Sequence, residues 1–122
     1  MTDAVFISGL ALHAYHGVMQ HEAKVGQTFT LDLMLDIDLS EASRTDKLKH
    51  TVSYEQLVKT ASEAFSARRC RLVEAAAGAV ADAVLGRYPL VNSVRVTVRK
   101  PHAPIAATFD DVGVIITRAR RK

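Results

Sequence analysis

The chain has little of what several classes of protein depend on. Its 122 residues contain one cysteine, Cys70, and no tryptophan, beside three tyrosines and four phenylalanines. A single cysteine excludes an internal disulfide and is typical of a reducing compartment. No apolar run approaches the roughly 20 residues of a membrane span, and Met1-Thr2-Asp3-Ala4 has no basic region leading into a signal core. We therefore expect one soluble, cytoplasmic domain, residues 1–122.

Motifs of cofactor and nucleic-acid chemistry are missing as well. The sequence has no glycine-rich phosphate loop, no nucleophile elbow and no pair of closely spaced cysteines. Its net charge is +3, and the excess lies mostly in clusters at 68–71 and 118–122. Neither cluster has the interleaved aromatic side chains on which single-stranded nucleic acids stack. We predict no cofactor, no nucleic-acid partner and no membrane partner.

Three histidines, His13, His16 and His21, fall within nine residues of each other. Histidines from a strand and its loop can bind zinc. Their spacing matches no familiar ligand pattern, and no cysteine joins them. We therefore expect no metal site.

Alternating apolar and polar side chains predict four strands, at residues 4–15, 28–39, 92–100 and 111–118. The second is the clearest, with apolar residues at every odd position from Phe29 to Leu39. In the first, the alternation slips at Gly9, which predicts a β-bulge. Residues 16–27 are expected to form a loop, and residues 40–52 a polar connection.

Two helices are predicted between the second and third strands. Ser53 opens the first, with Gln56 three residues later in the form of a capping box. The second spans residues 71–88, is almost entirely apolar, and precedes Pro89. The order ββααββ predicts an α+β domain, with an antiparallel four-stranded sheet covered on one face by two helices. Two open sheet edges and an apolar helix favour an oligomer.

Lys100 lies where the third strand's alternation calls for an apolar side chain. Val94, Val96 and Val98 point to one face, and Lys100 follows in the same phase. A lysine leaving water beside apolar groups loses its proton more readily, which suits acid/base work. The alternative is that the strand ends before Pro101 and the ammonium reaches solvent.

Three further side chains are candidates for a site, each with a plainer alternative. Glu74 begins the second helix, where a carboxylate either complements the helix dipole or receives N–H donors from a ligand. Tyr54 follows the cap of the first helix and is either an interface aromatic or a ligand contact. Glu22 lies in the loop after the first strand, where a lone glutamate is usually solvated.

Taken together, the order and spacing of these segments resemble the dihydroneopterin aldolase family over nearly the whole chain. The matching segments are Tyr15-His16-Gly17 with Glu22 and Gly26-Gln27, Leu39-Ser40-Glu41-Ala42, Thr45-Asp46-Lys47-Leu48, Thr51-Val52-Ser53-Tyr54, Leu72-Val73-Glu74, the run from Val96 to Pro101, and Val112-Gly113-Val114. The resemblance implies a tunnelling fold whose subunits form a barrel-like ring of four, usually paired into a homo-octamer. It also implies sites between subunits.

The resemblance further implies cleavage of 7,8-dihydroneopterin in folate biosynthesis, with neither a metal ion nor a Schiff base. The implied site residues are Glu22, Tyr54, Glu74 and Lys100, with supporting contacts from Val52, Ser53 and Val73. Lys100 would be the general acid/base, and Tyr54 would deliver a proton to the enol intermediate. Glu22 would hold Lys100 and a water network, while Glu74 would accept bonds from the pterin.

Two other functions stay open at this point. One is a related epimerase acting on dihydroneopterin or its triphosphate, for which Arg68, Arg69 and Arg71 could supply cations. The aldolase itself could carry a side epimerase activity. The other is a non-enzymatic pterin-binding or assembly module, against which the four filled site positions argue.

Overall fold

The computed structural model describes residues 3–121. Four strands form one antiparallel sheet: β1 (Ala4–Ala14), β2 (Gln27–Asp36), β3 (Ser93–Arg99) and β4 (Gly113–Ala119). They lie side by side in chain order, so β1 and β4 form the edges of the described sheet. The predicted strands are confirmed, with shifts of a few residues at their ends. Met1, Thr2 and Lys122, on which parts of the signal-peptide and basic-tail predictions fall, lie outside the described residues.

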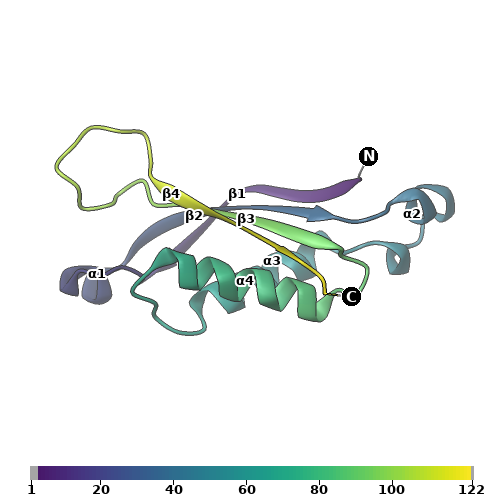
Figure 1. Cartoon of the computed structure of the whole chain (residues 1–122), viewed down its shortest axis with the longest axis horizontal. Coiled ribbons are helices and arrows are strands. Elements are labelled where there is room, and N and C mark those ends of the chain that lie inside the picture. Colours follow the sequence, from purple (N-terminus) through teal and green to yellow (C-terminus); the bar gives the residue numbers. More distant parts are fainter. Residues whose placement is uncertain (1–2, 122) are drawn as a thin grey trace.

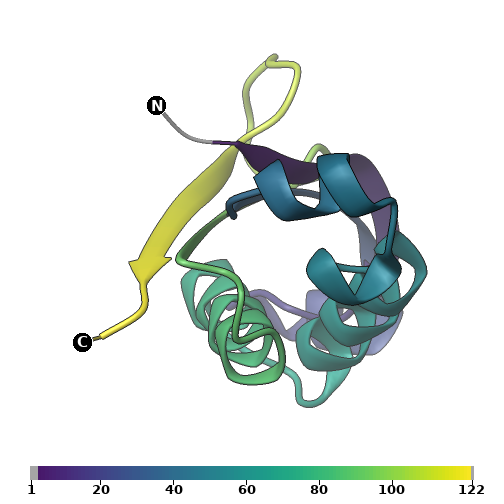
Figure 2. The ribbon, with the colours of Figure 1, turned by 90° about the vertical axis from the view of Figure 1, so that its right-hand side faces the viewer.

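Two long helices, α3 (Tyr54–Ser66) and α4 (Val73–Arg87), cover one face of the sheet (Figure 1). The predicted cap of α3 is confirmed, because the Ser53 hydroxyl accepts a bond from the backbone N–H of Gln56. The reciprocal half of a capping box is not formed between these two described residues, and the Gln56 side-chain oxygen accepts from Arg87. The sheet arches over both helices when it is viewed from one end (Figure 2). This arrangement confirms the predicted α+β domain with two helices on one face.

The segments predicted to be irregular contain short helices. The expected loop 16–27 includes α1 (Gln20–Val25), and the polar connection 40–52 includes α2 (Ser40–Thr45) and the 3₁₀ turn η1 (Leu48–His50). Helices of six residues show less than two turns of periodicity, so an apolar stripe cannot be recognised in them. The prediction of a plain loop at 16–27 was therefore wrong.

The core lies between the sheet and the two helices. It is formed by the odd-numbered side chains of β2 from Phe29 to Leu35, the three valines of β3, and the inner faces of α3 and α4. The apolar side chains whose alternation predicted β2 do face the core, since Phe29, Leu31 and Leu35 are fully buried. No helix among residues 3–121 is long and apolar enough to span a membrane.

Gly9 forms the predicted bulge. The pairing of β1 with β2 shifts register between Ile7 and Leu10, and Gly9 has a φ of 74°, in the left-handed region. Its backbone N–H, which the bulge frees from the ladder, donates to the Asp32 carboxylate at 2.8 Å. The bulge lets one strand keep apolar side chains toward the core on both sides of the slip.

The two long helices run in opposite directions, which gives the domain two distinct ends. At one end Gln56, near the start of α3, accepts a bond from Arg87, the last residue of α4. The start of α4 therefore lies at the other end. A helix of 15 residues is about 20 Å long, and this length separates the two ends.

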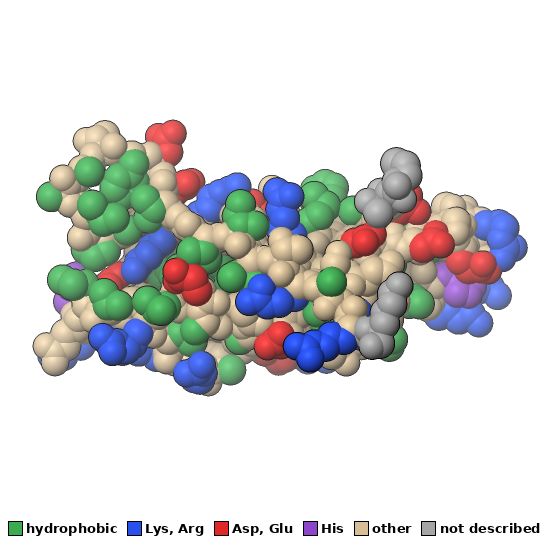
Figure 3. Space-filling model, in the orientation of Figure 1, with side chains coloured by type: hydrophobic (Ala, Val, Ile, Leu, Met, Phe, Trp, Pro, Cys, Tyr) green, Lys and Arg blue, Asp and Glu red, His purple; other side chains and the backbone are tan. Residues whose placement is uncertain are grey.

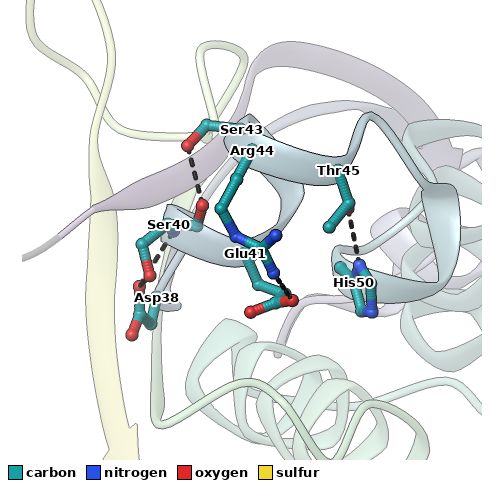
Figure 4. Close-up of polar contacts among 7 residues, drawn as sticks. All are labelled: Asp38, Ser40, Glu41, Ser43, Arg44, Thr45 and His50. Atoms are coloured by element: carbon teal, nitrogen blue, oxygen red, sulfur yellow. Dashed lines mark hydrogen bonds and ion pairs between the residues drawn. The ribbon is translucent and has the colours of Figure 1, made fainter.

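The connection that leads into α3 is held by its own polar contacts (Figure 4). The Ser40 backbone and hydroxyl both donate to Asp38, and Arg44 pairs with Glu41. The Thr45 hydroxyl contacts His50 Nδ1 at 2.7 Å, which ties α2 to η1. These bonds fix the path of the chain just before residues 52–54.

The face of the sheet away from the helices carries exposed apolar side chains. Phe6 is 62% exposed, Met34 44% and Ile115 59%. Figure 3 shows a second gathering of hydrophobic side chains over the long loop between β3 and β4, which includes the exposed Ile105. The domain thus leaves apolar surface uncovered on this sheet face and on this loop.

Candidate active site

Lys100 and Glu22 form a buried ion pair at one end of the sheet. Lys100 follows the last residue of β3, and its backbone N–H donates to the Val112 carbonyl at 2.6 Å. Its ammonium lies 2.6 Å from Glu22 Oε2, with side chains 14% and 2% exposed. The lysine therefore points inward, as the strand phase predicts, and does not extend into solvent.

Glu22 has a defined set of donors around its carboxylate. The backbone N–H of Met19 donates to Oε1 at 3.1 Å, and the side-chain amide of Gln27 donates to Oε2 at 2.9 Å. Burial raises the pKa of this carboxyl, but the bond and charge of Lys100 and these two donors outweigh it. The pKa of Glu22 consequently lies below its ordinary value, and the group is ionised at neutral pH. The contact with Lys100 agrees with the role that the resemblance implies for Glu22, and it rules out the plainer alternative of a solvated loop glutamate.

Gly17 makes room for the Glu22 carboxylate. Its φ is 146°, a conformation that favours glycine, and an added Cβ would lie 2.3 Å from Glu22 Oε1. Any larger residue at this position would push the carboxylate away from its donors. The His-Gly step before the short helix α1 is therefore part of how the chain builds the ion pair.

His16 joins this end of the sheet to the two long helices. The Cys70 backbone N–H donates to His16 Nδ1 at 2.9 Å, so Nε2 carries the proton and donates to the Phe65 carbonyl at 2.7 Å. Burial lowers the pKa of His16, opposed by the Phe65 bond, and the charges of Arg69 and Lys100 lower it further. The ring is thus a neutral structural link.

The loop between α3 and α4 is basic and lies against the end of β1. Arg69 donates to the carbonyls of Tyr15 and Gly17. Carbonyl acceptors orient a guanidinium without neutralising its charge. No carboxylate within residues 3–121 lies at ion-pair distance from Arg68, Arg69 or Arg71.

Val73 and Glu74 begin α4 close to the ion pair. Cys70, just before α4, connects the start of this helix to the ion pair, because its carbonyl accepts a hydrogen bond from the backbone N–H of Gly17 at 3.0 Å. Val73 is half-buried and Glu74 is exposed. We call Glu22, Lys100, Val73 and Glu74 the lysine end.

The other three predicted residues lie at the opposite end of the domain. Val52 is buried, Ser53 is half-buried and caps α3, and Tyr54 is 66% exposed. Tyr54 lines an open groove of about 410 Å³ with residues 4–7 of β1. We call these three residues the tyrosine end. The structure brings Glu22 and Lys100 into contact, and it leaves Tyr54 about 20 Å away from them.

The three clustered histidines do not converge. Both ring nitrogens of His16 are already bonded to the backbone, whereas His13 and His21 are exposed. Across the described part of the chain, no three histidine, cysteine or acidic side chains are grouped so that they could hold a metal ion.

Sequence reasoning did not identify His16, Gly17 or Gln27 as parts of this end. The only available signal was the Tyr15-His16-Gly17 segment followed by Glu22 and Gly26-Gln27, which entered the resemblance without assigned roles for these three residues. The bonds of His16 reach Phe65 and Cys70, far away in the chain, and the contacts of Gly17 and Gln27 with Glu22 span five residues, which matches neither a strand nor a helix period.

Comparison with known proteins agrees with this architecture. The family model described as dihydroneopterin aldolase matches residues 5–117. A dihydroneopterin aldolase of Methylorubrum extorquens is 38% identical over 98% of this chain and 92% of its own length. One of Bacillus subtilis is 36% identical over 97% of this chain and 98% of its own.

A solved structure extends the likeness to three dimensions. The dihydroneopterin aldolase of E. coli, crystallised in complex with neopterin, superposes with a TM-score of 0.87 at 32% identity. The superposition covers 96% of this chain and 99% of that one. Sequence and fold thus agree over the same residues.

Proposed function

This chain belongs to the dihydroneopterin aldolase family, and from that membership we propose its substrate and its catalytic groups. The substrate is 7,8-dihydroneopterin, and the products are 6-hydroxymethyl-7,8-dihydropterin and glycolaldehyde. This reaction belongs to folate biosynthesis. The observation that carries the assignment of groups is the buried contact of 2.6 Å between Lys100 and Glu22.

The reaction is a retro-aldol cleavage that needs proton transfers and orientation. The bond between the first two carbons of the substrate's side chain breaks while the hydroxyl on the second carbon loses its proton and becomes the aldehyde. The electron pair moves into the C=N bond of the pterin ring, whose nitrogen takes a proton. The resulting enol then gains a proton on carbon while the ring nitrogen loses its proton, which restores the C=N bond. Because the ring itself accepts the electrons, the protein has only to hold the substrate and move protons.

Lys100 is the general acid/base in this proposal. Acting through a water, its ammonium gives a proton to the ring nitrogen, and the neutral amine so formed accepts the hydroxyl proton. The ionised Glu22 fixes the ammonium and the water beside it. No step requires a Schiff base, a metal ion or a cofactor, and we expect enzyme treated with a chelator to keep its rate. A strict requirement for added zinc would contradict this mechanism.

Glu74 binds the pterin at the lysine end. It is exposed at the start of α4, where its carboxylate is free to accept N–H donors from the amino group and ring of the ligand. The backbone of Val73 adds a supporting contact. Neopterin in the E. coli structure is a ligand of the same chemical class.

Tyr54 acts on the substrate of a neighbouring subunit. A pterin is much shorter than the roughly 20 Å between the tyrosine end and the lysine end, so one chain cannot bring both to one molecule. The open edges β1 and β4 and the exposed Phe6, Met34 and Ile115 support an assembly of copies. We propose rings of four, two rings to a homo-octamer, with Val52, Ser53 and Tyr54 completing each neighbour's site. The buried free thiol of Cys70 fits a cytoplasmic location.

A second candidate function is epimerisation of dihydroneopterin triphosphate. It is favoured by the loop arginines, because Arg69 is held by carbonyls and keeps its positive charge near Gly17. Cleavage, rotation of the aldehyde and re-formation of the bond would use the same groups.

One assay separates these functions. Purified protein is incubated with dihydroneopterin or its triphosphate, and the products are resolved by chromatography. We expect glycolaldehyde and hydroxymethyl-dihydropterin to dominate with dihydroneopterin. Isomerised triphosphate as the main product would favour the epimerase. Pterin binding without turnover of either compound would favour a non-enzymatic binding module.

A further inference from the structure

Gln27 has a buried amide oxygen with no partner beside the ion pair. Its side-chain nitrogen donates to Glu22 Oε2 at 2.9 Å, and the same oxygen lies 2.6 Å from Lys100 Nζ. The amide oxygen of Gln27 is buried, and it accepts no hydrogen bond from any of residues 3–121. The amide nitrogen of Gln27 is therefore hydrogen-bonded to Glu22, whereas its amide oxygen lies beside the ion pair without a donor.

The orientation of this amide is fixed by its neighbour. An ionised carboxylate can only accept hydrogen bonds, so the NH₂ group must face Glu22. Turning the amide over would place two acceptors against each other. Its oxygen is consequently held inside the protein, where an unpaired polar atom is costly and calls for a donor.

We propose that Gln27 is a positioning residue for the Glu22–Lys100 pair, and that its amide oxygen receives an O–H donor lying next to Lys100. The proposal rests on the proposed function of this site. The donor is either a water that relays protons to Lys100 or a hydroxyl of the substrate's side chain. Both have the same hydrogen-bonding chemistry, and kinetics distinguishes them.

A glutamine suits both tasks, and its nearest relatives in size do not. Methionine has a similar length, but it neither donates to Glu22 nor accepts strongly. Glutamate keeps the acceptors but loses the donor, and it places a second carboxylate against Glu22. Two such carboxylates disfavour ionisation of both, which raises the pKa of one of them.

The test compares Gln27→Met and Gln27→Glu with the wild-type enzyme. Gln20→Met serves as the matched control, because Gln20 is exposed on α1. For Gln27→Met we expect a loss in kcat of about 10²-fold, the size of effect a small misplacement of catalytic groups causes. An unchanged KM would identify the donor as a water, and a raised KM would identify it as the substrate's hydroxyl. Gln20→Met should behave as wild type.

The pH profile gives a readout that a purely structural role would not move. For Gln27→Glu we expect the acid limb of kcat/KM to shift to higher pH, because the paired carboxylates hold a proton more tightly. Wild-type kcat and pH profiles in both variants would overturn the proposal, whatever their melting temperatures.

A direct titration of the Glu22 carboxyl tests the positioning role of Gln27 independently of whether the protein catalyses the proposed reaction. In labelled protein, carbon NMR follows the Glu22 carboxyl, and Gln27→Met should raise the pKa of Glu22 because a donor to its ionised form is gone. An unchanged Glu22 titration would overturn the positioning role even in an active enzyme. A raised pKa in a protein that turns over no pterin would leave the role of Gln27 intact and reject the proposed function.

Discussion

The lysine end and the tyrosine end differ in how complete a single chain makes them. At the lysine end, Glu22 and Lys100 are in contact, nearly buried and supplied with additional donors. At the tyrosine end, Tyr54 is 66% exposed beside an open groove. One end is therefore preorganised by the folding of its own chain. At the other end, Tyr54 is proposed to contact substrate only after a neighbouring subunit has bound.

This difference predicts different kinds of damage from mutation. Removing a group from the lysine end disturbs a network that exists in every chain, with costs in both chemistry and stability. Removing Tyr54 should leave the fold of the chain untouched and act only on the assembled site. Four experiments test this contrast.

Lys100→Ala should have the largest effect. We expect turnover of dihydroneopterin to fall about 10²–10⁴-fold, the usual contribution of a general acid/base, while the pterin still binds. Steady-state kinetics and a fluorescence titration with a pterin measure the two quantities. The exposed Lys24 on α1 provides the control, and Lys24→Ala should keep the wild-type rate.

The same variant tests how the pair contributes to the fold. Removing the lysine leaves Glu22 buried without its counter-charge, and breaking a buried pair in this way typically costs about 3–5 kcal/mol. Lys100→Gln, which keeps a donor near Glu22, guards against a variant that fails to fold. A substrate adduct trapped on Lys100 by borohydride would reject the acid/base role and support a Schiff base.

Glu74→Ala should weaken pterin binding more than it slows chemistry. The loss of this acceptor leaves two ligand donors unpaired, which costs roughly 1–3 kcal/mol. Isothermal titration with a pterin measures the change in affinity. Asp82→Ala, which removes the other acidic side chain of α4, is the matched control and should bind normally. Unchanged affinity in Glu74→Ala would remove this residue from the site.

Mixed oligomers test whether the two ends of different chains meet. Tyr54→Ala and Lys100→Ala proteins, each nearly inactive, are unfolded together and reassembled. If each site takes Tyr54 from one chain and Lys100 from its neighbour, random mixing restores about a quarter of the sites. Activity should therefore return to about that fraction of wild type. Mass spectrometry of differently tagged chains confirms the mixing, and inactive but well-mixed oligomers would place the whole site within one chain.

The smallest expected effect is a pH dependence of stability from His16. Its pKa is lowered in the folded protein, chiefly by burial. Below the ordinary histidine value of about 6.5, the unfolded chain therefore binds a proton that the folded chain does not. Stability should be level above this pH and fall as the pH drops through it, by at most about 1.4 kcal/mol per pH unit for one group.

Denaturation at several pH values checks this prediction. His16→Gln removes the titrating group and should lose this component of the slope, although its stability at neutral pH will be lower. The exposed His21 is the control, and His21→Gln should keep the wild-type slope. An unchanged slope in His16→Gln would assign the pH dependence to other groups.

Much of the lysine end was predictable, but not its contacts. The phase of β3 predicts that Lys100 faces inward, because a strand alternates its side chains whatever surrounds it. Glu22 carried no such signal, since a helix of six residues is too short to show a period. Its burial depends on Gly17, Gln27 and Lys100, which reach it from three different segments.

The amino-acid sequence was sufficient to predict the local structure of this protein: four alternating strands, the bulge at Gly9, the Ser53 cap and the inward phase of Lys100. Each follows from the geometry of a few consecutive residues, so neighbours in the chain suffice to define it. The contact between Glu22 and Lys100, and the separation of Tyr54 from both by about one helix length, became visible only in the folded chain. These distances depend on the directions of α3 and α4 and on how the two helices pack against the sheet. The periodicity of apolar residues along the chain contains no information about helix direction or packing.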